Sequence, residues 1–403
     1  MCLPAGRQVI SVMKTQKEKI LVAMSGGVDS SVAAALLVEQ GYDVTGAHMI
    51  NFDADSADNN AENADIKCWL PDYRDATRVA AKLGIPLLKL DFVKEYRDTV
   101  LKYMYDEYKK GRTPNPDVMC NRWVKFGFWL EKARELGFDK MVTGHYALIT
   151  KTHDLRSKHK NTKTLYELRQ AKDENKDQTY FLHQLNQEQL SQTLFPLGDY
   201  TKDEVRKLAA KFDLPTANKE ESMGICFVGE VDMKEFLQKE IKRKPGKIIL
   251  NSGEVVGEHE GLAFYTLGQR HIGVRSEKWE VRSRDDKPLF VVDKRFESNE
   301  LVVGYEDDPL LFKSKIEVVD VNWIAGEAPK MPFECEVRLR HRQEMQNAQV
   351  SKFQPEAGQP LAEVSAQDGS YIVKFKKSQR AVTPGQFAVF YLKGGCLGGG
   401  VIK

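Results

Sequence analysis

Residues 25–31 read SGGVDSS and follow an apolar run at residues 20–24. Two glycines between an expected strand and an expected helix direct backbone N–H groups and the helix dipole at one point, which favours an anion. Ser25 and Ser30 add hydroxyl donors, whereas Asp29 would repel phosphate unless it binds a cation or orients a donor. The stretch lacks the spacing and the lysine of a Walker A loop. It predicts a polyphosphate site with Mg²⁺, and the alternative is an ordinary glycine turn with a serine helix cap.

A second stretch, GRTPNPDVMCNRWVKFG at residues 111–127, combines a carboxylate with a thiol. Two prolines favour an irregular loop, and a helix beginning after Pro116 would put Asp117 and Cys120 on one face. A thiolate needs a nearby positive charge or a helix N-terminus, and a loop-to-helix junction offers the latter. Cys226, 106 residues later (226 − 120), lies in ESMGICFVGE between apolar neighbours. Either cysteine could instead be a small buried apolar residue.

The elements before residue 227 alternate between apolar runs and helical patterns, which is typical of a parallel sheet covered by helices on both faces. Strands are expected at residues 20–24, 44–50, 85–92 and 140–142, and helices at residues 31–40, 76–83 and 201–212. Gly41 and Gly84 are expected to end the first two helices, and Thr201 with Glu204 forms a capping-box pattern for the third. Ligands of such sheets bind beyond the carboxyl ends of the strands, here after Met24, Met49 and Val142.

The second half of the chain reads as mostly β-structure. A helix at residues 231–241 precedes an expected hairpin in which NSG joins KIIL to EVVGEH. From about residue 310 apolar and polar residues alternate along the chain. Cys335, Val337 and Leu339 share one predicted strand face, and Arg338 and Arg340 share the other. These patterns predict an extension at residues 1–18, a nucleotide-binding catalytic domain at 19–227, a β-rich domain at 228–308 and a β-barrel at 309–403.

The composition excludes a strongly cationic or strongly acidic protein, because 60 basic and 58 acidic residues leave a net charge of +2. A local basic arm remains at residues 151–163 and predicts phosphate contacts, unless it is simply solvated; its members are Lys151, Arg156, Lys158, Lys160 and Lys163. No apolar stretch is long enough for a membrane helix and no signal peptide is recognisable, so a cytoplasmic protein is expected. Six cysteines without a CxxC pair argue against a disulfide scaffold. Met13 looks as good a start as Met1.

Six motifs in this order, SGGVDSS, GRTPNPDVMCN, VTGHY, NKDQTYFL, MGICFVGE and CLGGGVIK, together resemble the MnmA/TrmU family of tRNA-specific 2-thiouridylases. SGGVDSS itself resembles the PP-loop of ATP pyrophosphatases. The resemblance implies a doubly wound parallel sheet of the adenine nucleotide alpha-hydrolase type, a small central β-rich domain and a C-terminal β-barrel that helps to clasp tRNA. It also implies that ATP adenylates the C2 oxygen of the wobble uridine and that persulfide sulfur then displaces AMP. The implied partners are tRNA and an upstream persulfide donor or relay protein.

The resemblance also implies the roles of individual residues. ATP, with Mg²⁺, would bind at Ala23, Met24, Ser25, Gly26, Gly27, Val28, Asp29, Ser30, Met49 and Gly144. Cys120 would be the nucleophile, Cys226 the persulfide carrier and Asp117 an acid or base, with a Cys120–Cys226 disulfide left after sulfur release. The tRNA would contact Asn115, Pro116, Asp117, His145, Lys176, Asp177, Gln178, Arg340, His341 and Gln386. His341 departs from the family, in which tyrosine is more usual there.

Three alternatives remain open from the sequence. A small-molecule PP-loop synthetase would need neither two separated thiols nor an RNA-binding barrel. A non-catalytic RNA-binding module would have no use for SGGVDSS. An iron–sulfur cluster held by Asp117, Cys120 and Cys226 could carry the sulfur instead, although these residues lack the clustered cysteine spacing usual for such centres.

Overall fold

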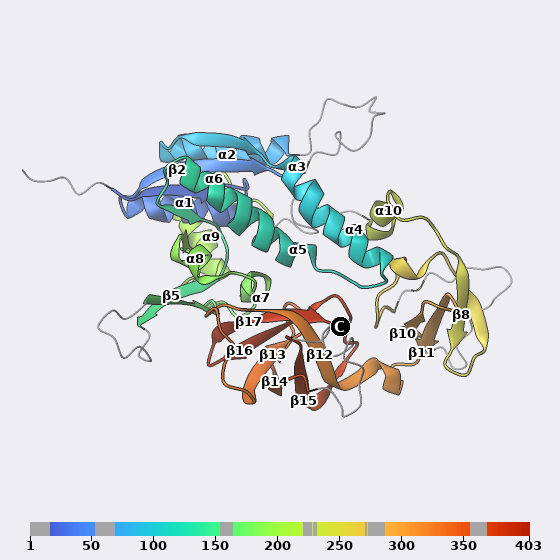
Figure 1. Ribbon diagram of the computed structural model, residues 1–403. Coiled ribbons are helices and arrows are strands. Elements are labelled where there is room, and N and C mark those ends of the chain that lie inside the picture. The colour runs from blue at the N-terminus through green and yellow to red at the C-terminus, as the bar shows by residue number, and fades with distance from the viewer. Residues whose placement is uncertain are drawn as a thin grey trace, which may run out of the picture.

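The computed structural model describes residues 17–52, 69–153, 164–220, 228, 232–270, 272, 287–354 and 369–403. Figure 1 shows a parallel sheet with its helices at one end of the molecule, a small β-rich unit at the other, and a barrel beside both. The predicted fold class is therefore confirmed. No helix within the described ranges is long and apolar enough to cross a membrane.

The parallel sheet has the strand order β3-β2-β1-β4-β7 in the described part of the chain. Its strands are β1 (Lys19–Ala23), β2 (Asp43–Ile50), β3 (Leu87–Asp91), β4 (Lys140–Val142) and β7 (Thr193–Leu194). Successive β1 side chains point to opposite faces, so Ile20 and Val22 join one apolar cluster and Leu21 joins another. Both faces are covered, as a doubly wound sheet requires.

The helices on one face are α1 (Val28–Glu39), α2 (Leu70–Leu83) and α9 (Lys202–Lys211). α1 begins three residues before the expected Ser31, because the chain turns helical directly after Gly27. The predicted signals at the helix ends are confirmed. Gly41 and Gly84 adopt left-handed backbone conformations, with φ of 85° and 67°, and Thr201 and Glu204 form the capping box of α9.

The other face carries two long helical segments, each with a π-helical stretch that sequence reasoning did not predict. The first consists of α3 (Val93–Tyr96), η2 (Arg97–Leu101) and α4 (Lys102–Lys109), and the second of α5 (Pro116–Met119), η3 (Cys120–Trp129) and α6 (Leu130–Glu135). The first segment extends from the sheet toward the central β-rich unit (Figure 1). Two short helices, α7 (Thr179–Leu182) and α8 (Gln187–Ser191), follow in the chain.

The central unit begins with helix α10 (Met233–Gln238). Its strands are β8 (Gly246–Leu250), β9 (Val255–His259), β10 (Phe290–Arg295) and β11 (Glu300–Gly304), in the order β10-β11-β8-β9. β8 and β9 form the predicted antiparallel hairpin. The 3-10 helix η4 (Leu262–Phe264) packs its Leu262 against Ile248 and Val291 of this sheet.

The C-terminal barrel follows the 3-10 helix η5 (Pro309–Leu311). It consists of β12 (Phe312–Trp323), β13 (Phe333–Arg338), β14 (Gln346–Lys352), β15 (Tyr371–Arg380), β16 (Phe387–Leu392) and β17 (Gly395–Ile402), and pairing of β12 with β17 closes it. Cys335, Val337 and Leu339, which were predicted to share one face, are buried in the same apolar cluster. Arg338, which was predicted on the other face of the strand, is only 7% exposed because it pairs with a buried carboxylate.

A hairpin of the first domain extends the barrel sheet. β6 (Thr164–Arg169) pairs with β17, and β5 (Leu148–His153) pairs with β6. The first domain and the barrel are thereby joined through main-chain hydrogen bonds of this hairpin, a connection that the alternation of apolar and polar residues did not reveal.

Candidate functional site

The SGGVDSS loop lies where β1 ends and α1 begins. Gly26 has φ of +80°, and a Cβ there would collide with the carbonyl oxygen of Asp72, so only glycine fits. Gly27 is the N-cap of α1, and its carbonyl accepts a hydrogen bond of 2.7 Å from the Ser31 hydroxyl. The Ser25 and Ser30 hydroxyls lie 3.3 Å apart. This arrangement leaves first-turn N–H groups of α1 directed at one point, as anion binding requires.

Loops after the neighbouring strands close around this turn. A Cβ on Gly144, which follows β4, would lie 2.8 Å from the Ser30 nitrogen, so glycine allows the β4 loop to touch the start of α1. The backbone N–H of Met24 donates to Ala47 in β2, and Met49 near the end of β2 is 5% exposed. The three loops singled out from the sequence therefore lie at one edge of the sheet, because β2, β1 and β4 are adjacent and parallel.

Asp29 does not present the free carboxylate expected of a Mg²⁺ ligand. Both of its oxygens accept hydrogen bonds from the Lys202 ammonium, at 2.8 and 2.9 Å, and the Tyr146 hydroxyl donates to one of them at 2.8 Å. The Lys202 side chain is 11% exposed. The carboxylate instead orients a cationic donor, the second role that the sequence allowed.

A second ammonium, that of Lys219, also borders the loop. Lys219 donates to the Gly26 carbonyl at 3.1 Å and to Asp72 and Asp75 at 2.8 and 2.6 Å. Burial opposes the charge of Lys219, but the bonds to the two carboxylates raise its pKa above the ordinary lysine value. Sequence reasoning missed Lys202 and Lys219. The sequence signal that could have pointed to them is that SGGVDSS lacks a lysine of its own. These two distant lysines bring positive charge to the loop.

The second constellation lies on α5 and η3. Asn115 caps α5 by accepting a hydrogen bond from the Val118 nitrogen at 3.3 Å, and Pro116 occupies the first helical turn. Cys120 is fully buried, whereas Asp117 is half-buried. Asp117 and Cys120, which were expected on one helix face, therefore do not form a shared exposed surface. Cys120 faces the apolar cluster that contains Val118. Trp129 ties η3 to the sheet edge through a 3.1 Å hydrogen bond to Asn51.

Several predicted residues lie outside the described ranges. They include Cys226 and, in the basic arm, Arg156, Lys158, Lys160 and Lys163. Lys151 is described and lies on β5. The predicted meeting of Cys120 with Cys226 consequently remains a prediction.

The predicted RNA contacts from the first domain are mostly structural in this conformation. Asp177 is 1% exposed and accepts a hydrogen bond from Arg338 of the barrel at 3.0 Å. His145 is 7% exposed and pairs with the Thr143 hydroxyl at 2.7 Å, and burial followed by the charge of Lys125 lowers its pKa well below the usual value. Gln178 accepts a hydrogen bond from the Tyr146 nitrogen. The buried Asp177 and His145 are not available to a nucleic acid at the surface, whereas Lys176 and Gln178 are half-exposed.

The predicted barrel contacts lie near the catalytic domain. Arg340 is exposed and donates to the Ala381 carbonyl. The ring of His341 lies 4.6 Å from that of Phe181, and burial with the nearby charges of Arg342, Arg338 and Lys176 lowers the pKa of His341 to about 4. Gln386 donates to the carbonyls of Thr113 and Pro114 in the loop before α5.

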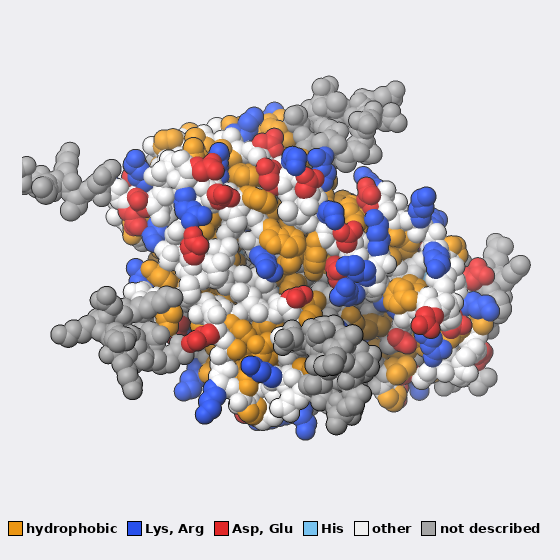
Figure 2. All heavy atoms as spheres, viewed as in Figure 1, with side chains coloured by type: hydrophobic (Ala, Val, Ile, Leu, Met, Phe, Trp, Pro, Cys, Tyr) orange, Lys and Arg blue, Asp and Glu red, His pale blue; other side chains and the backbone are white. Residues whose placement is uncertain are grey.

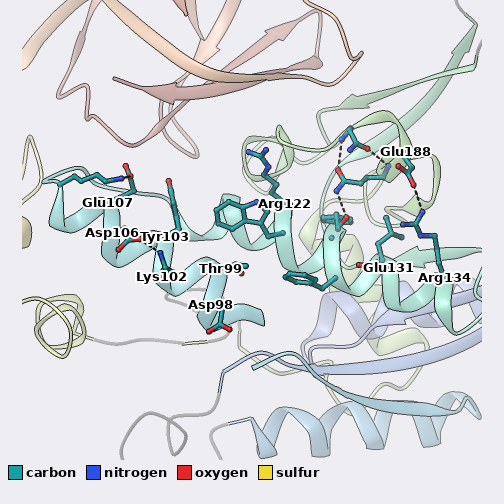
Figure 3. Close-up of a pocket in the computed structure, with 18 residues that line it drawn as sticks. Asp98, Thr99, Lys102, Tyr103, Asp106, Glu107, Arg122, Glu131, Arg134 and Glu188 are labelled. Atoms are coloured by element: carbon teal, nitrogen blue, oxygen red, sulfur yellow. Dashed lines mark hydrogen bonds and ion pairs between the residues drawn. The ribbon is translucent and has the colours of Figure 1, made fainter. Parts of the chain in front are cut away.

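A cavity of about 700 Å³ lies elsewhere, along the two long helical segments (Figure 3). Tyr103, Arg122 and Trp123 line it together with acidic and basic side chains such as Glu131 and Arg134, and no residue of SGGVDSS is among them. Its mixed charge does not suit a polyphosphate. Figure 2 likewise shows basic and acidic side chains intermixed over the face in view.

Three family models match successive parts of the chain. They are described as a tRNA methyl transferase HUP domain (residues 18–230), a tRNA methyl transferase PRC-barrel domain (234–305) and an aminomethyltransferase beta-barrel domain (313–402). The tRNA-specific 2-thiouridylase MnmA of Shouchella clausii is 45% identical over 393 residues, which cover 96% of this chain and 97% of that protein. The enzyme of the same name from Francisella tularensis subsp. novicida is 43% identical over 391 residues, with 96% and 99% covered.

The chain belongs to the MnmA family. The domain models are named for methyl transfer, whereas the full-length relatives are named for thiolation. Because the relatives match over nearly the whole of both chains, their name takes precedence over the names of the domain models. The resemblance noted from the motifs is therefore confirmed. Among solved structures, NMN synthetase from Francisella tularensis is similar over 57% of this chain and 85% of its own, with 16% identity and a TM-score of 0.31, a likeness too distant to bear on activity.

Proposed function

We propose that this member of the MnmA family is a tRNA uridine 2-sulfurtransferase that uses ATP to activate the wobble uridine and then replaces its C2 oxygen with sulfur. The observation that carries the proposal is the glycine-rich turn at the carboxyl edge of the parallel sheet, in a chain that matches 2-thiouridylases over nearly its full length. A tRNA substrate would place the enzyme in the cytoplasm.

ATP would bind at the turn, with its phosphates facing the first-turn N–H groups of α1. The adjoining positions proposed for this site are Ala23, Met24, Ser25, Gly26, Gly27, Val28, Asp29, Ser30, Met49 and Gly144. Lys202 and Lys219 support the proposal because they bring positive charge to a loop without its own lysine. The side chains at the turn suit Mg²⁺ less well than they suit phosphate. Both Asp29 oxygens already accept hydrogen bonds from Lys202, and the described residues form no cluster of three metal-binding side chains.

The chemistry follows from the poor leaving ability of a carbonyl oxygen. Transfer of AMP to the C2 oxygen releases pyrophosphate and makes AMP the leaving group. The terminal sulfur of a Cys226 persulfide would then attack C2, and AMP would depart with the oxygen. Attack of the Cys120 thiolate on Cys226 Sγ would break the S–S bond, leave sulfur on C2 and form a Cys120–Cys226 disulfide, which an external thiol must reduce.

Asn115, Pro116 and Asp117 would meet the uridine, with Asp117 as acid or base. The base must leave the anticodon stack for this, because enzymes that modify a base draw it into a pocket. A disulfide requires Cα atoms within about 7 Å, and Cys120 is buried, so we expect the region around α5 to rearrange when tRNA binds. Lys176, Gln178, Arg340 and His341 are proposed to border the tRNA.

The test is nucleoside mass spectrometry of unmodified tRNA after incubation with protein, ATP and a small-molecule persulfide donor. The proposal requires 2-thiouridine and tRNA-dependent AMP. Cys120→Ser and Cys226→Ser should still adenylate tRNA and release pyrophosphate yet fail to add sulfur, since activation and sulfur transfer use different groups. AMP formation without tRNA would indicate a small-molecule synthetase instead.

The iron–sulfur alternative has a separate test. Anaerobically purified protein with visible absorbance and stoichiometric iron would replace the persulfide relay with a cluster held by Asp117, Cys120 and Cys226. Colourless protein that is active with a persulfide donor supports the relay.

A further inference from the structure

The loop before α5, residues 111–115, is held by side chains from both other domains. Lys294 of the central unit donates to the Gly111 carbonyl at 2.5 Å, and Gln386 of the barrel donates to the Thr113 and Pro114 carbonyls at 2.9 and 3.0 Å. The Thr113 nitrogen donates in turn to Pro384 of the barrel at 2.9 Å. Contacts from two domains therefore reach the loop at its first residue and at the residues just before Asn115.

Lys294 is itself fixed in place. Its ammonium also donates to the Tyr265 carbonyl at 2.9 Å, and it lies 6.0 Å from the centre of the Phe296 ring. Burial lowers the pKa of Lys294 to about 8, so it remains mostly protonated at neutral pH. A half-buried ammonium shared between two carbonyls connects the central unit to Gly111.

Close packing reinforces both contacts. A Cβ on Gly111, whose φ is +75°, would collide with the Phe296 ring. A Cβ on Gly385 of the barrel would lie 2.8 Å from the Cβ of Arg112 and 3.1 Å from the Thr113 nitrogen. Glycine at both positions permits an approach that the hydrogen bonds then fix.

We propose that Lys294 and Gln386 are positioning residues, which hold loop 111–115 so that Asn115, Pro116 and Asp117 meet the uridine in a reactive geometry. The inference rests on the proposed function, and it gives Gln386 a different task from direct RNA contact. Fixed geometry matters because displacement of a catalytic group by about 1 Å can cost roughly a hundredfold in rate. It follows that a tRNA that shifts the central unit or the barrel also shifts this loop.

The test compares Lys294→Met with Lys294→Arg, which keeps a donor and a charge. Lys247→Met is the matched control, because Lys247 is an exposed lysine on β8 of the same unit. Hydrogen exchange of the free protein should be about tenfold faster at residues 111–115 in Lys294→Met, because a charged hydrogen bond is lost there. Exchange in β1 and the melting temperature should stay as in the parent protein.

Single-turnover thiolation should also fall about tenfold in Lys294→Met at unchanged tRNA affinity. Lys294→Arg should recover most of the rate, and the control should lose none. Unchanged exchange in loop 111–115 would overturn the inference, as would a loss confined to tRNA affinity or an unchanged rate. The exchange measurement needs no activity, so it tests the inference even if the parent protein forms no 2-thiouridine. If Lys294→Met does not fold, Gln386→Ala tests the other end of the loop by the same readouts.

Discussion

At the scale of single residues, the nucleotide site depends on charges that come from outside its motif. Asp29 holds Lys202 beside the start of α1, and Lys219 binds the Gly26 carbonyl. The sequence indicated that a polyphosphate site here lacked a positive charge, but pairing across 173 residues, as between Asp29 and Lys202, cannot be inferred from local spacing.

Removal of the Lys202 ammonium should impair adenylation more than folding. We expect Lys202→Met to lower the rate of AMP formation by about 10²-fold or more, the usual cost of losing one preorganised donor to developing charge. Asp29→Ala should behave similarly because it releases Lys202. Lys211→Met is the control, since Lys211 lies on the same helix and its side chain is 61% exposed. A folded Lys202→Met protein with the parent rate would contradict this role.

His183 should make the protein sensitive to acid. Burial lowers its pKa to about 4, opposed by its hydrogen bond to the Tyr180 carbonyl and assisted by Arg122. Since the unfolded chain binds this proton near pH 6.5 and the folded chain near pH 4, the free energy of unfolding should fall as pH drops between these values, by up to about 3 kcal/mol. His183→Asn, which can keep a donor to Tyr180, should flatten this dependence in denaturant titrations at pH 7, 6 and 5. An equally steep dependence in the variant would exclude His183 as its source.

At the scale of elements, the loop before α7 is locked to β13. Arg338 and Asp177 form an ion pair of 3.0 Å with side chains 9% and 0% exposed, and Thr179 lies between Asp177 and Tyr391. A pair so deeply buried connects the catalytic domain to the barrel.

Breaking this pair should be costly because a buried carboxylate is left without its cation. We expect Arg338→Met to destabilise the protein by about 3–5 kcal/mol, and Asp177→Asn combined with Arg338→Met to cost less than Arg338→Met alone. Arg134→Met, which removes an exposed pair with Glu188, should cost at most about 1 kcal/mol. Chemical denaturation of the parent protein and the three variants checks this order. Equal losses of stability in Arg338→Met and Arg134→Met would refute it.

Periodicity and capping signals predicted β1, α2, α9 and the β8–β9 hairpin, because each depends on residues close in the sequence. The same reasoning failed where tertiary partners decide. The sequence did not predict that Arg338 forms a buried ion pair with Asp177. It also did not predict that the β5–β6 hairpin pairs with a barrel strand more than 220 residues away, at Arg169 and Gly395. Gly26 and Gly144 were found by motif, and the structure supplies their physical reason: a Cβ on Gly26 would collide with the Asp72 carbonyl, and a Cβ on Gly144 would collide with the start of α1.

At the scale of the whole molecule, three units hold the segment on the two sides of Cys120. Asn51, which follows β2 of the parallel sheet, anchors η3, the central unit holds Gly111, and the barrel holds Thr113 and Pro114. Figure 1 shows α5 between the parallel sheet and the barrel. This arrangement explains how the position of one short loop can depend on contacts from all three units. It also places the proposed base-binding residues between the domains expected to meet tRNA.

The central claim is that the uridine C2 oxygen leaves as part of AMP. It is tested most directly with tRNA transcribed from uridine triphosphate labelled with oxygen-18 at C2, incubated with the protein, ATP and a persulfide donor. We predict that each 2-thiouridine formed is accompanied by one AMP whose phosphate carries a single oxygen-18 atom. Unlabelled AMP together with 2-thiouridine would contradict the account, because the C2 oxygen would then have left by another route.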